Sequence, residues 1–500
     1  MSGLVVFAAC ALILVLGYFV YGKVAERVYG VDYKMIMPCV RLHDGVDYVA
    51  MPVWRVFMIQ LLNIAGLGPV FGALAGCLFG PAALLWIVLG CLLAGAVHDF
   101  LSAVACAEHD GETLPELVGR YLGSPARLAM RGLCIVLMLL VGVVFTAGPA
   151  GMLHALVSEV SVIWWSVIIL GYYFLATILP INALIGRVYP FFGVLFIFMA
   201  VSLAVMLPLT PEVTVLPEFD MTKAWHPKNL SVWPMIFVTI ACGAISGFHA
   251  TQSPMMVRCM ENPRRLRTVF YGAMVVEGLV ALIWCVVGLS LRELATDYAL
   301  VADTAGKLVP QLLQEGEQGV TFCQLTMVNP AVAVDQACTW LLGPVGAVIA
   351  VLGVVVLPIT SGDTALRCCR LMLAEAFGLS QVSRVKRLQV ALPVFACVII
   401  ISFVDFSVIW RYFGWANQAL SCFTLWALAV LLRQRRRFHW IVTVPALFMT
   451  TVCTTYLLNA PDCGIELPIG ISTAVGAVIT ILCAVSFLYL RGRATASGKN

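Results

Sequence analysis

Long apolar runs separated by short polar connections dominate the chain. Each run has about 20 residues, which as a helix is enough to cross the roughly 30 Å hydrocarbon core of a bilayer. The pattern predicts an all-α polytopic membrane protein with about thirteen transmembrane helices. The predicted spans cover residues 3–20, 53–78, 80–105, 131–151, 161–179, 189–209, 231–254, 269–290, 338–360, 388–404, 412–431, 438–458 and 468–490.

The polar connections are too short to form a separate soluble domain. We therefore predict a single transmembrane domain over residues 1–500. Basic residues follow the first run instead of preceding it, and the run lacks a convincing small-residue cleavage site, so we interpret it as a span and not as a signal peptide. The longest connections are residues 21–52, 106–130, 291–337 and 361–387.

The composition agrees with this class: 62% of the 500 residues are hydrophobic and only 11% are charged, which excludes an ordinary soluble globular protein. The net charge of +4 does not predict a nucleic-acid partner, because the basic residues are sorted by connection and form no single patch. Most of the 18 cysteines lie in apolar runs, where Cys behaves as a small hydrophobe. Whether Cys323 and Cys463, in two connections on the same predicted side, form a disulfide stays open.

The distribution of Lys and Arg predicts the orientation. If the spans alternate in direction, all but five of the 30 basic residues fall on one side of the membrane, and basic residues favour the cytoplasmic side. We therefore predict that the N-terminus lies outside and the C-terminus inside. The densest basic clusters are residues 258–267, 384–387 and 433–437.

Two predicted spans contain helix-breaking residues: the second holds NIAGLGP (63–69) in its middle, and the seventh holds ACGAISGFHATQSP (241–254). Gly weakens a helix and Pro removes a backbone donor. Backbone groups freed inside a membrane must then meet protein, water or a ligand. The two interrupted spans are separated by five positions in the order of spans, so they run in opposite directions. This arrangement predicts inverted repeats over residues 53–209 and 231–431, followed by extra spans at 438–490.

Paired breaks are the best sequence indication of a transporter's binding site. At a break, freed N–H groups suit an anionic group and freed carbonyls can coordinate a cation. The alternative is that small residues only let helices pack closely, which we favour for Gly72 and Gly76. The predicted substrate-binding residues are Asn63, Ala65, Gly66, Gly68, Pro69, Ser246, Gly247, His249 and Gln252.

Ionisable residues inside the predicted spans are candidates for coupling. Glu277 lies about 12 Å along the eighth span, which carries no basic residue; it either carries a coupling proton or is a structural carboxyl bonded to a neighbouring helix. Asp99, beside His98 near the end of the third span, either ligates an ion, carries a proton, forms a gate or has an ordinary interfacial role. His249 either contacts substrate, carries a proton or is structural.

Hydroxyl and carboxyl oxygens gather near the end of the ninth span, in LPITSGDTALR. Thr360, Ser361, Thr364 and Asp363 form an oxygen-rich cluster that suits a hard cation such as sodium. The alternative is helix capping at the end of the span, because Ser, Thr and Asp are common capping residues.

Five motifs resemble those of the carbon starvation protein A (CstA) family of bacterial peptide and pyruvate uptake proteins. Together they extend over about the first 290 residues, with a weaker similarity at ITSGDTALR. The motifs are GVDYVAMPVW (45–54), NIAGLGPVFG (63–72), LWIVLGCLLAGAVHDF (85–100), SGFHATQSP (246–254) and YGAMVVEG (271–278).

The resemblance implies a symporter of the bacterial cytoplasmic (inner) membrane with a LeuT-like core of five-plus-five inverted repeats, related to amino acid and polyamine carriers. It also implies uptake of small peptides or of a small carboxylate such as pyruvate during carbon starvation. The chain is similar to the shorter branch of the family. Long members carry a His pair before the first break, where this chain has Ile59 and Gln60. The resemblance therefore implies the fold but does not establish which substrate this chain transports.

These features predict a secondary active transporter that works by alternating access, is coupled to H⁺ or Na⁺, and needs no cofactor. The chain has neither a GxxxxGK[ST] phosphate loop nor an HExxH pattern, so we predict neither ATP-driven transport nor an enzyme. The alternative is a membrane nutrient sensor that binds the same ligands without net transport, and a channel also stays open. The expected partners are a small-molecule or peptide substrate and membrane lipid; the oligomeric state is not indicated.

Overall fold

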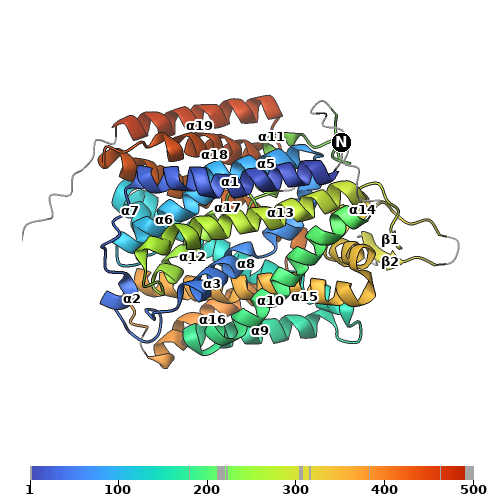
Figure 1. The fold of residues 1–500 in the computed structure, drawn as a ribbon, viewed down its shortest axis with the longest axis horizontal. Helices are drawn as coiled ribbons and strands as arrows, with labels where there is room; N and C mark the ends of the chain where they lie inside the picture. Colours follow the sequence, from blue (N-terminus) through green and yellow to red (C-terminus); the bar gives the residue numbers. More distant parts are fainter. Residues whose placement is uncertain are drawn as a thin grey trace, which may run out of the picture.

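The structure is a computed structural model, and helices dominate it (Figure 1). It describes residues 3–179, 181–210, 220, 223–302, 308–314, 317–381, 383–461 and 463–489. The helices of the first half are α1 (Gly3–Tyr29), α2 (Pro38–Arg41), α3 (Val53–Ala65), η1 (Gly68–Gly72), α4 (Ala73–Cys77), α5 (Ala82–Gly90), η2 (Cys91–Gly95), α6 (Ala96–Glu108), α7 (Leu114–Leu122), α8 (Ser124–Leu156), α9 (Val162–Ile178) and α10 (Ile181–Leu209).

The second half continues the helical pattern and adds one hairpin. Its elements are α11 (Val232–Thr239), α12 (Gly247–Val257), η4 (Pro263–Arg265), η5 (Arg267–Tyr271), α13 (Gly272–Leu291), β1 (Tyr298–Ala302), β2 (Leu308–Leu312), α14 (Phe322–Val328), α15 (Pro330–Ala376), α16 (Arg384–Ile401), α17 (Phe406–Gln434), α18 (Trp440–Asn459) and α19 (Ile469–Tyr489).

Each predicted apolar run coincides with one helix or with consecutive helices. Within the described residues, nine helices are long and apolar enough to cross a membrane, or ten if the bent pair Val53–Ala65 and Gly68–Cys77 is one span. The multi-span helical architecture is therefore confirmed. The count of thirteen spans, the inverted repeat and the orientation stay predictions.

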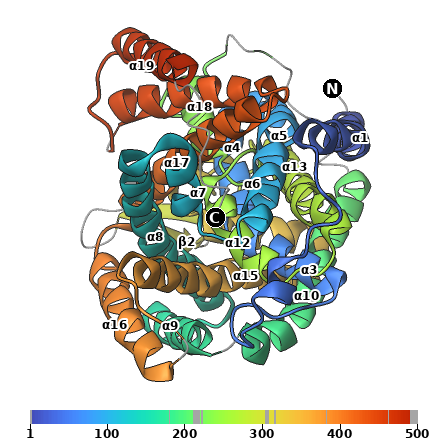
Figure 2. The same ribbon diagram turned by 90° about the vertical axis from the view of Figure 1, so that its left-hand side faces the viewer.

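In the end-on view, helices such as α1, α9, α16 and α19 lie at the periphery and α12 lies near the middle (Figure 2). Most residues of α13 and α17 and of the α5–α6 run are buried, whereas few residues are buried in α1, in the Phe191–Leu209 part of α10 and in α19, and each of these leaves several large apolar side chains exposed. Exposed apolar surface on this scale requires lipid around it. The central helices α6, α12, α13 and α17 are therefore shielded from the membrane by the outer ones.

A short antiparallel hairpin departs from the all-α expectation. Strands β1 and β2 pair with Leu300 opposite Pro310 and Val301 opposite Val309. Aliphatic residues on both strands favour extended backbone, and a two-stranded hairpin has an open edge at which Pro310 is tolerated. The hairpin marks one end of the bundle, the hairpin end, and α2 lies at the opposite end, the α2 end (Figure 1).

Ion pairs join helices at the α2 end. Arg258, just after α12, has Nη2 3.4 Å from Glu375 Oε1 on α15, and Arg435, just after α17, has Nη2 2.6 Å from Glu108 Oε2 on α6. Residues 37–51 cross the same end, where they meet the chain that follows α12. These contacts tie together segments far apart in the sequence. The structure contains no disulfide between Cys323 and Cys463.

Candidate functional site

The second predicted span is broken where the sequence predicts. Helix α3 ends at Ala65 and the π-helical turn η1 begins at Gly68, with a bend of 50° between the two parts. Gly66 has a φ of 45°, which L side chains rarely adopt, and a Cβ there would lie 2.6 Å from Phe145. Pro69 stands in the first turn of η1, where a missing N–H costs no helical hydrogen bond. The sequence therefore encodes this break.

The seventh predicted span is broken as well. Helix α11 ends at Thr239 and α12 begins at Gly247. A residue of another helix satisfies the start of α12: Asn417 Oδ1, on α17, accepts hydrogen bonds from the Phe248 N–H at 2.7 Å and from the Ser246 hydroxyl at 2.9 Å. Because a buried helix N-terminus needs acceptors for its free N–H groups, Asn417 stabilises this break.

The two breaks lie against each other. A Cβ at Gly68 would be 2.2 Å from the Cβ of Cys242, so only a glycine fits this approach. Gly72 and Gly76 likewise pack against the chain around Ile240. The packing interpretation of these two later glycines is therefore confirmed, and the breaks of the two proposed repeats share one interface.

Four ionisable residues meet beside this interface. His249 Nδ1 lies 2.9 Å from Asp99 Oδ2, and His249 Nε2 lies 3.4 Å from Glu277 Oε2. His98 Nδ1 lies 2.9 Å from the other oxygen of Asp99. All four side chains are fully buried. Helices α6, α12 and α13 each contribute to this group, which we call the His–carboxylate cluster.

The His–carboxylate cluster can change its charge only by proton or cation exchange. Its two carboxyl groups and two imidazoles lie in a water-excluded interior, where unpaired charge is costly. Both Glu277 oxygens and the Nε2 atoms of His98 and His249 have no hydrogen-bond partner. An imidazole between two carboxylates can hold a proton on either side, so the cluster has spare sites for a proton.

A metal ion would also find donors here. Cys242, His249 and Glu277 place one ligand atom each within 4.8 Å of one another, and no other group of three such residues occurs in the described ranges. Thiolate with imidazole suits soft or borderline cations. The Cys242 sulfur, however, already contacts the Ser246 hydroxyl at 3.7 Å and the Asn417 amide at 3.6 Å, as a neutral thiol does.

Asp363 forms a second buried polar group with two tyrosines. Tyr172 donates to Asp363 Oδ2 at 2.7 Å, and Tyr189 donates to Oδ1 at 3.0 Å. The Tyr189 hydroxyl also lies 3.1 Å from Asn63 Oδ1 and 2.9 Å from the Thr360 carbonyl. Asn63, predicted at the first break, is thereby linked to the predicted oxygen-rich cluster.

The hydroxyl residues of α15 hold α3 in place. The Thr360 and Ser361 hydroxyls lie 3.0 and 3.1 Å from the Leu62 carbonyl of α3, and they also lie 2.8 and 3.0 Å from the Leu357 carbonyl of their own helix. The capping alternative for these residues is wrong, because α15 does not end near residue 360 but continues to Ala376. A side chain in the middle of a helix cannot cap it, and here the hydroxyls bridge to a neighbouring helix instead.

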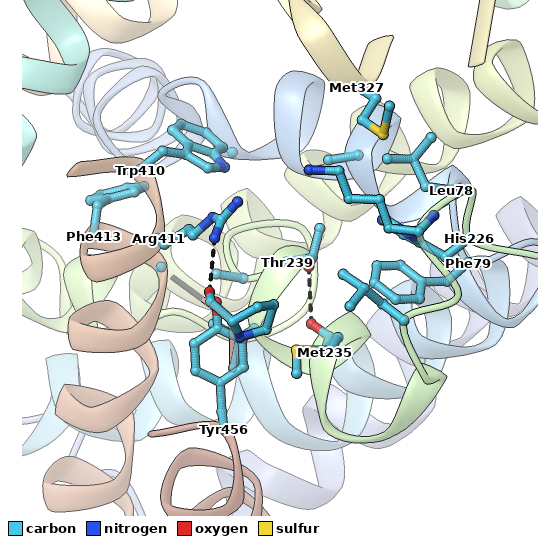
Figure 3. Close-up of a pocket in the computed structure, with 18 of the residues that line it drawn as sticks. Leu78, Phe79, His226, Met235, Thr239, Met327, Trp410, Arg411, Phe413 and Tyr456 are labelled. Carbon is cyan, nitrogen blue, oxygen red and sulfur yellow. Dashed lines mark hydrogen bonds between the residues drawn. The ribbon is translucent and has the colours of Figure 1, made fainter. Parts of the chain in front are cut away.

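A partly open cavity of about 450 Å³ leads from the breaks toward the hairpin end. Gly68 and Cys242 line it at the breaks, and Met327 of α14 lines it near the hairpin end (Figure 3). Arg411 of α17 projects into it and donates to the Pro461 carbonyl at 2.8 Å. Further lining residues are Phe79, His226, Lys228, Thr239, Trp410, Phe413 and Tyr456.

His226 is a neutral member of this lining. Burial, together with the nearby charges of Lys228 and Arg292, lowers the pKa of His226 to about 4. Its Nδ1 accepts a hydrogen bond from the Lys228 backbone N–H at 3.1 Å, which requires an unprotonated Nδ1. At neutral pH the basic charge of the cavity therefore comes from Lys228 and Arg411.

Comparison with known proteins identifies the family of the chain and several relatives that are described as transporters. The family described as Carbon starvation protein CstA matches residues 2–163 and 149–456. The chain belongs to the CstA family. The peptide transporter CstA of Campylobacter jejuni is 26% identical to this CstA-family chain, over 91% of this chain and 79% of its own length. An uncharacterized membrane protein of Haemophilus influenzae is 41% identical over 57% of this chain and 91% of its own.

A further relative is described by its cargo. The pyruvate/proton symporter BtsT of Escherichia coli is 26% identical over 61% of this chain and 51% of its own length. Among solved structures, the chain superposes on Mhp1, a nucleobase-cation-symport-1 family transporter, with a TM-score of 0.51. The two are 13% identical, and the match covers 88% of this chain and 93% of the Mhp1 chain. This likeness concerns the fold alone. The CstA-family chain is a multi-pass protein of the bacterial inner membrane, as predicted.

The structure of this CstA-family chain brings together most predicted site residues, but in two groups. His249 joins Asp99 and Glu277, whereas Asn63 joins Asp363. Gln252 joins neither group and donates to its neighbour Thr251. The remaining predicted residues lie in the main chain at the two breaks: Ala65, Gly66, Gly68, Pro69, Ser246 and Gly247.

The sequence analysis missed several polar residues of these groups. The omissions are Tyr172, Tyr189, Lys228, Arg411 and Asn417. The amide pair at 417–418 inside an apolar run was a usable signal, because polar residues within spans are functional candidates. The tyrosines had no such signal, since Tyr is ordinary in membrane helices.

Proposed function

We propose that this protein is a secondary active transporter that imports a small carboxylate or small peptides by alternating access. One observation carries the proposal: two broken helices pack against each other beside a fully buried His–carboxylate cluster, and a cavity leads from them to one end of the bundle. A sensor needs a binding site but not buried titratable groups beside it. Carriers need both, because cargo and coupling ion must respond to the same conformational change.

Protons are the proposed coupling ion. In the His–carboxylate cluster, Glu277 and His249 retain polar atoms without hydrogen-bond partners, so a proton can be added there without breaking an existing bond. At the alternative sodium site, both oxygens of Asp363 already accept hydrogen bonds from tyrosines. Sodium would compete with those two donors for the Asp363 oxygens.

The proposed cargo follows from the relatives and from the cavity. Relatives are described as peptide transporters and as a pyruvate/proton symporter, and cargo of both kinds carries a carboxylate. Lys228 and Arg411 line the cavity, and basic side chains at a cavity mouth attract anions. A carboxylate would enter from the hairpin end and reach the breaks at Gly68 and Cys242.

We further propose the topology that the basic residues favour. The N-terminus and the hairpin end face outside, and the α2 end, which holds the clusters around Arg258 and Arg435, faces the cytoplasm. Thirteen spans, with a LeuT-like inverted repeat over residues 53–209 and 231–431, complete the proposal. In this orientation the cavity lies toward the outside, and the ion pairs Arg258–Glu375 and Arg435–Glu108 lie toward the cytoplasm.

Uptake into proteoliposomes tests the proposal. Labelled pyruvate and a labelled dipeptide are offered under an imposed proton gradient or an imposed sodium gradient. We expect proton-driven accumulation of one cargo, its loss in Glu277→Gln, and wild-type accumulation in the control Glu293→Gln, whose side chain is 81% exposed. Exchange of labelled for unlabelled cargo without a gradient should survive in Glu277→Gln, since it needs no net proton movement.

Two results would contradict parts of the proposal. Sodium-driven uptake that survives Glu277→Gln moves the coupling site to Thr360, Ser361 and Asp363. Binding of pyruvate or dipeptide by the purified protein without accumulation under either gradient overturns transport in favour of the nutrient sensor.

A further inference from the structure

Three arginines lie buried at the α2 end. Arg367 and Arg370 project from α15 and Arg387 from α16, with 1%, 0% and 3% of their surfaces exposed. Arginines that only set topology remain in water or among headgroups, and Arg is almost never fully buried unless it is paired. Burial of three such side chains therefore needs a partner for each. We call them the arginine cluster.

The residues that the structure describes supply too few acceptors for this cluster. Arg367 Nη1 lies 3.3 Å from Asp47 Oδ1, and its Nη2 donates to two backbone carbonyls. Arg370 donates to the Gln381 side chain. The buried nitrogens without any hydrogen-bond partner are Arg367 Nε, Arg370 Nε and Nη2, and Arg387 Nε and Nη1. All three guanidinium groups thus direct unsatisfied donors into the interior.

The charges do not balance either. Among residues that the structure describes, Asp47 is the one carboxylate that forms an ion pair with any of the three arginines. Three positive charges therefore face a single negative one in a region closed to water. A buried charge without a counter-charge is strongly disfavoured, and an anion in the cluster would satisfy the donors and the charge together.

We propose that the arginine cluster binds the phosphate group of an anionic ligand. Guanidinium groups match phosphate oxygens in bidentate pairs, and a tetrahedral phosphate accepts from several directions, which suits donors carried by two helices. Basic pockets between membrane helices on the cytoplasmic side are suited to anionic headgroups. Nearby, Phe377 and Val385 are 73% and 64% exposed, apolar surface against which acyl chains can lie.

A phospholipid headgroup and free inorganic phosphate share this chemistry, and thermal unfolding separates them. The full-length protein is purified in a neutral detergent and unfolded with added phosphatidylglycerol, phosphatidylcholine or inorganic phosphate at constant ionic strength. Two charge-removing variants, Arg370→Met and Arg387→Met, are compared with Arg384→Met, an exposed arginine on the first turn of α16. Native mass spectrometry counts the lipid molecules retained by each.

We expect phosphatidylglycerol, and not phosphatidylcholine, to raise the melting temperature of the wild type and of Arg384→Met. Arg370→Met and Arg387→Met should bind phosphatidylglycerol at least about tenfold more weakly. Without lipid they should be as stable as the wild type or more so, because each removes an uncompensated charge. This last result also shows that the variants fold.

The source of the phosphate is decided in the same assay. An equal shift by inorganic phosphate, lost in Arg370→Met, supports the site with a soluble ligand. No shift of the wild type by phosphatidylglycerol or phosphate overturns the proposal, as does an equal shift in Arg370→Met and Arg387→Met. Transport is not measured in this assay, so its outcome does not depend on the proposed function.

Discussion

Asp99 and His249 are 150 positions apart in the sequence, yet Asp99 Oδ2 lies 2.9 Å from His249 Nδ1 in the fully buried centre of the bundle. Asp99 stands on α6 and His249 in the first turn of α12, directly after the second break. A change in the position of α12 would therefore alter the surroundings of a titratable pair. This is the coupling that a proton-driven carrier needs between helix movement and proton binding.

If the proposed function holds, Asp99→Asn should abolish the coupling of uptake to protons. The amide cannot accept from two imidazoles with full negative charge, so we expect proton-driven accumulation to fall at least about tenfold. The free energy of unfolding should fall by about 1–3 kcal/mol, as for other buried bonds to charged groups. The matched control is Ser102→Ala on the same helix, because that hydroxyl donates only to the Asp99 backbone carbonyl at 3.0 Å. If Asp99→Asn accumulated cargo as the wild type does, the His–carboxylate cluster would have no role in proton coupling.

Gly68→Ala should disrupt the interface between the two breaks. The added Cβ would lie 2.2 Å from the Cβ of Cys242, and such overpacking costs about 1–3 kcal/mol. We expect a lower melting temperature and little uptake, with partial recovery of both in the double variant Gly68→Ala/Cys242→Gly. At Gly151, in α8, a Cβ meets nothing within 4 Å, so Gly151→Ala should be neutral. Failure of the double variant to recover would show that the contact is not the cause.

The two breaks were predicted from the sequence because Gly and Pro act locally. Gly66 adopts a φ of 45°, and this requirement is readable from one residue and its neighbours. The pairing of Gly68 with Cys242 was not predictable, because it depends on how two segments 174 positions apart pack against each other. Sequence analysis therefore located both breaks but not their contact.

The polar residues illustrate the same limit. Asp99, His249 and Glu277 were each noticed as ionisable groups in apolar spans, yet nothing in their spacing indicated that they meet. The capping alternative for Thr360 failed because the hydroxyl pattern of a helix end and that of a helix–helix bridge are identical in sequence. Three-dimensional packing decided between them.

Tyr189→Phe should weaken the contact between α3 and α15. The hydroxyl contacts Asn63, Asp363 and the Thr360 carbonyl. Its removal leaves a buried carboxylate with one fewer donor, so we expect the free energy of unfolding to fall by about 1–3 kcal/mol. Tyr412→Phe, at a side chain that is 41% exposed, should change it by less than about 0.5 kcal/mol. Equal melting temperatures for the two variants would contradict the role assigned to Tyr189.

His226 should make stability sensitive to mild acid. Its pKa is lowered to about 4 in the folded protein, through burial and then through Lys228 and Arg292, against about 6.5 when unfolded. The unfolded chain therefore binds a proton at a pH where the folded chain does not, so the stabilisation is complete above about pH 6.5 and is lost as pH falls toward 4. Protonation would also break the hydrogen bond that Nδ1 accepts from the Lys228 N–H.

His226→Gln removes this titration while the amide oxygen can still accept a hydrogen bond. Melting temperatures measured from pH 7.5 to 4.5 should fall more steeply in the wild type than in His226→Gln, by the equivalent of about 1–3 kcal/mol. His43→Gln, at an exposed histidine, should keep the wild-type slope. Because His226 stays neutral between pH 5 and 8, the pH profile of uptake should be the same in His226→Gln and in the wild type. A step in that profile that disappears in His226→Gln would mean that His226, and not the buried cluster, takes up the proton.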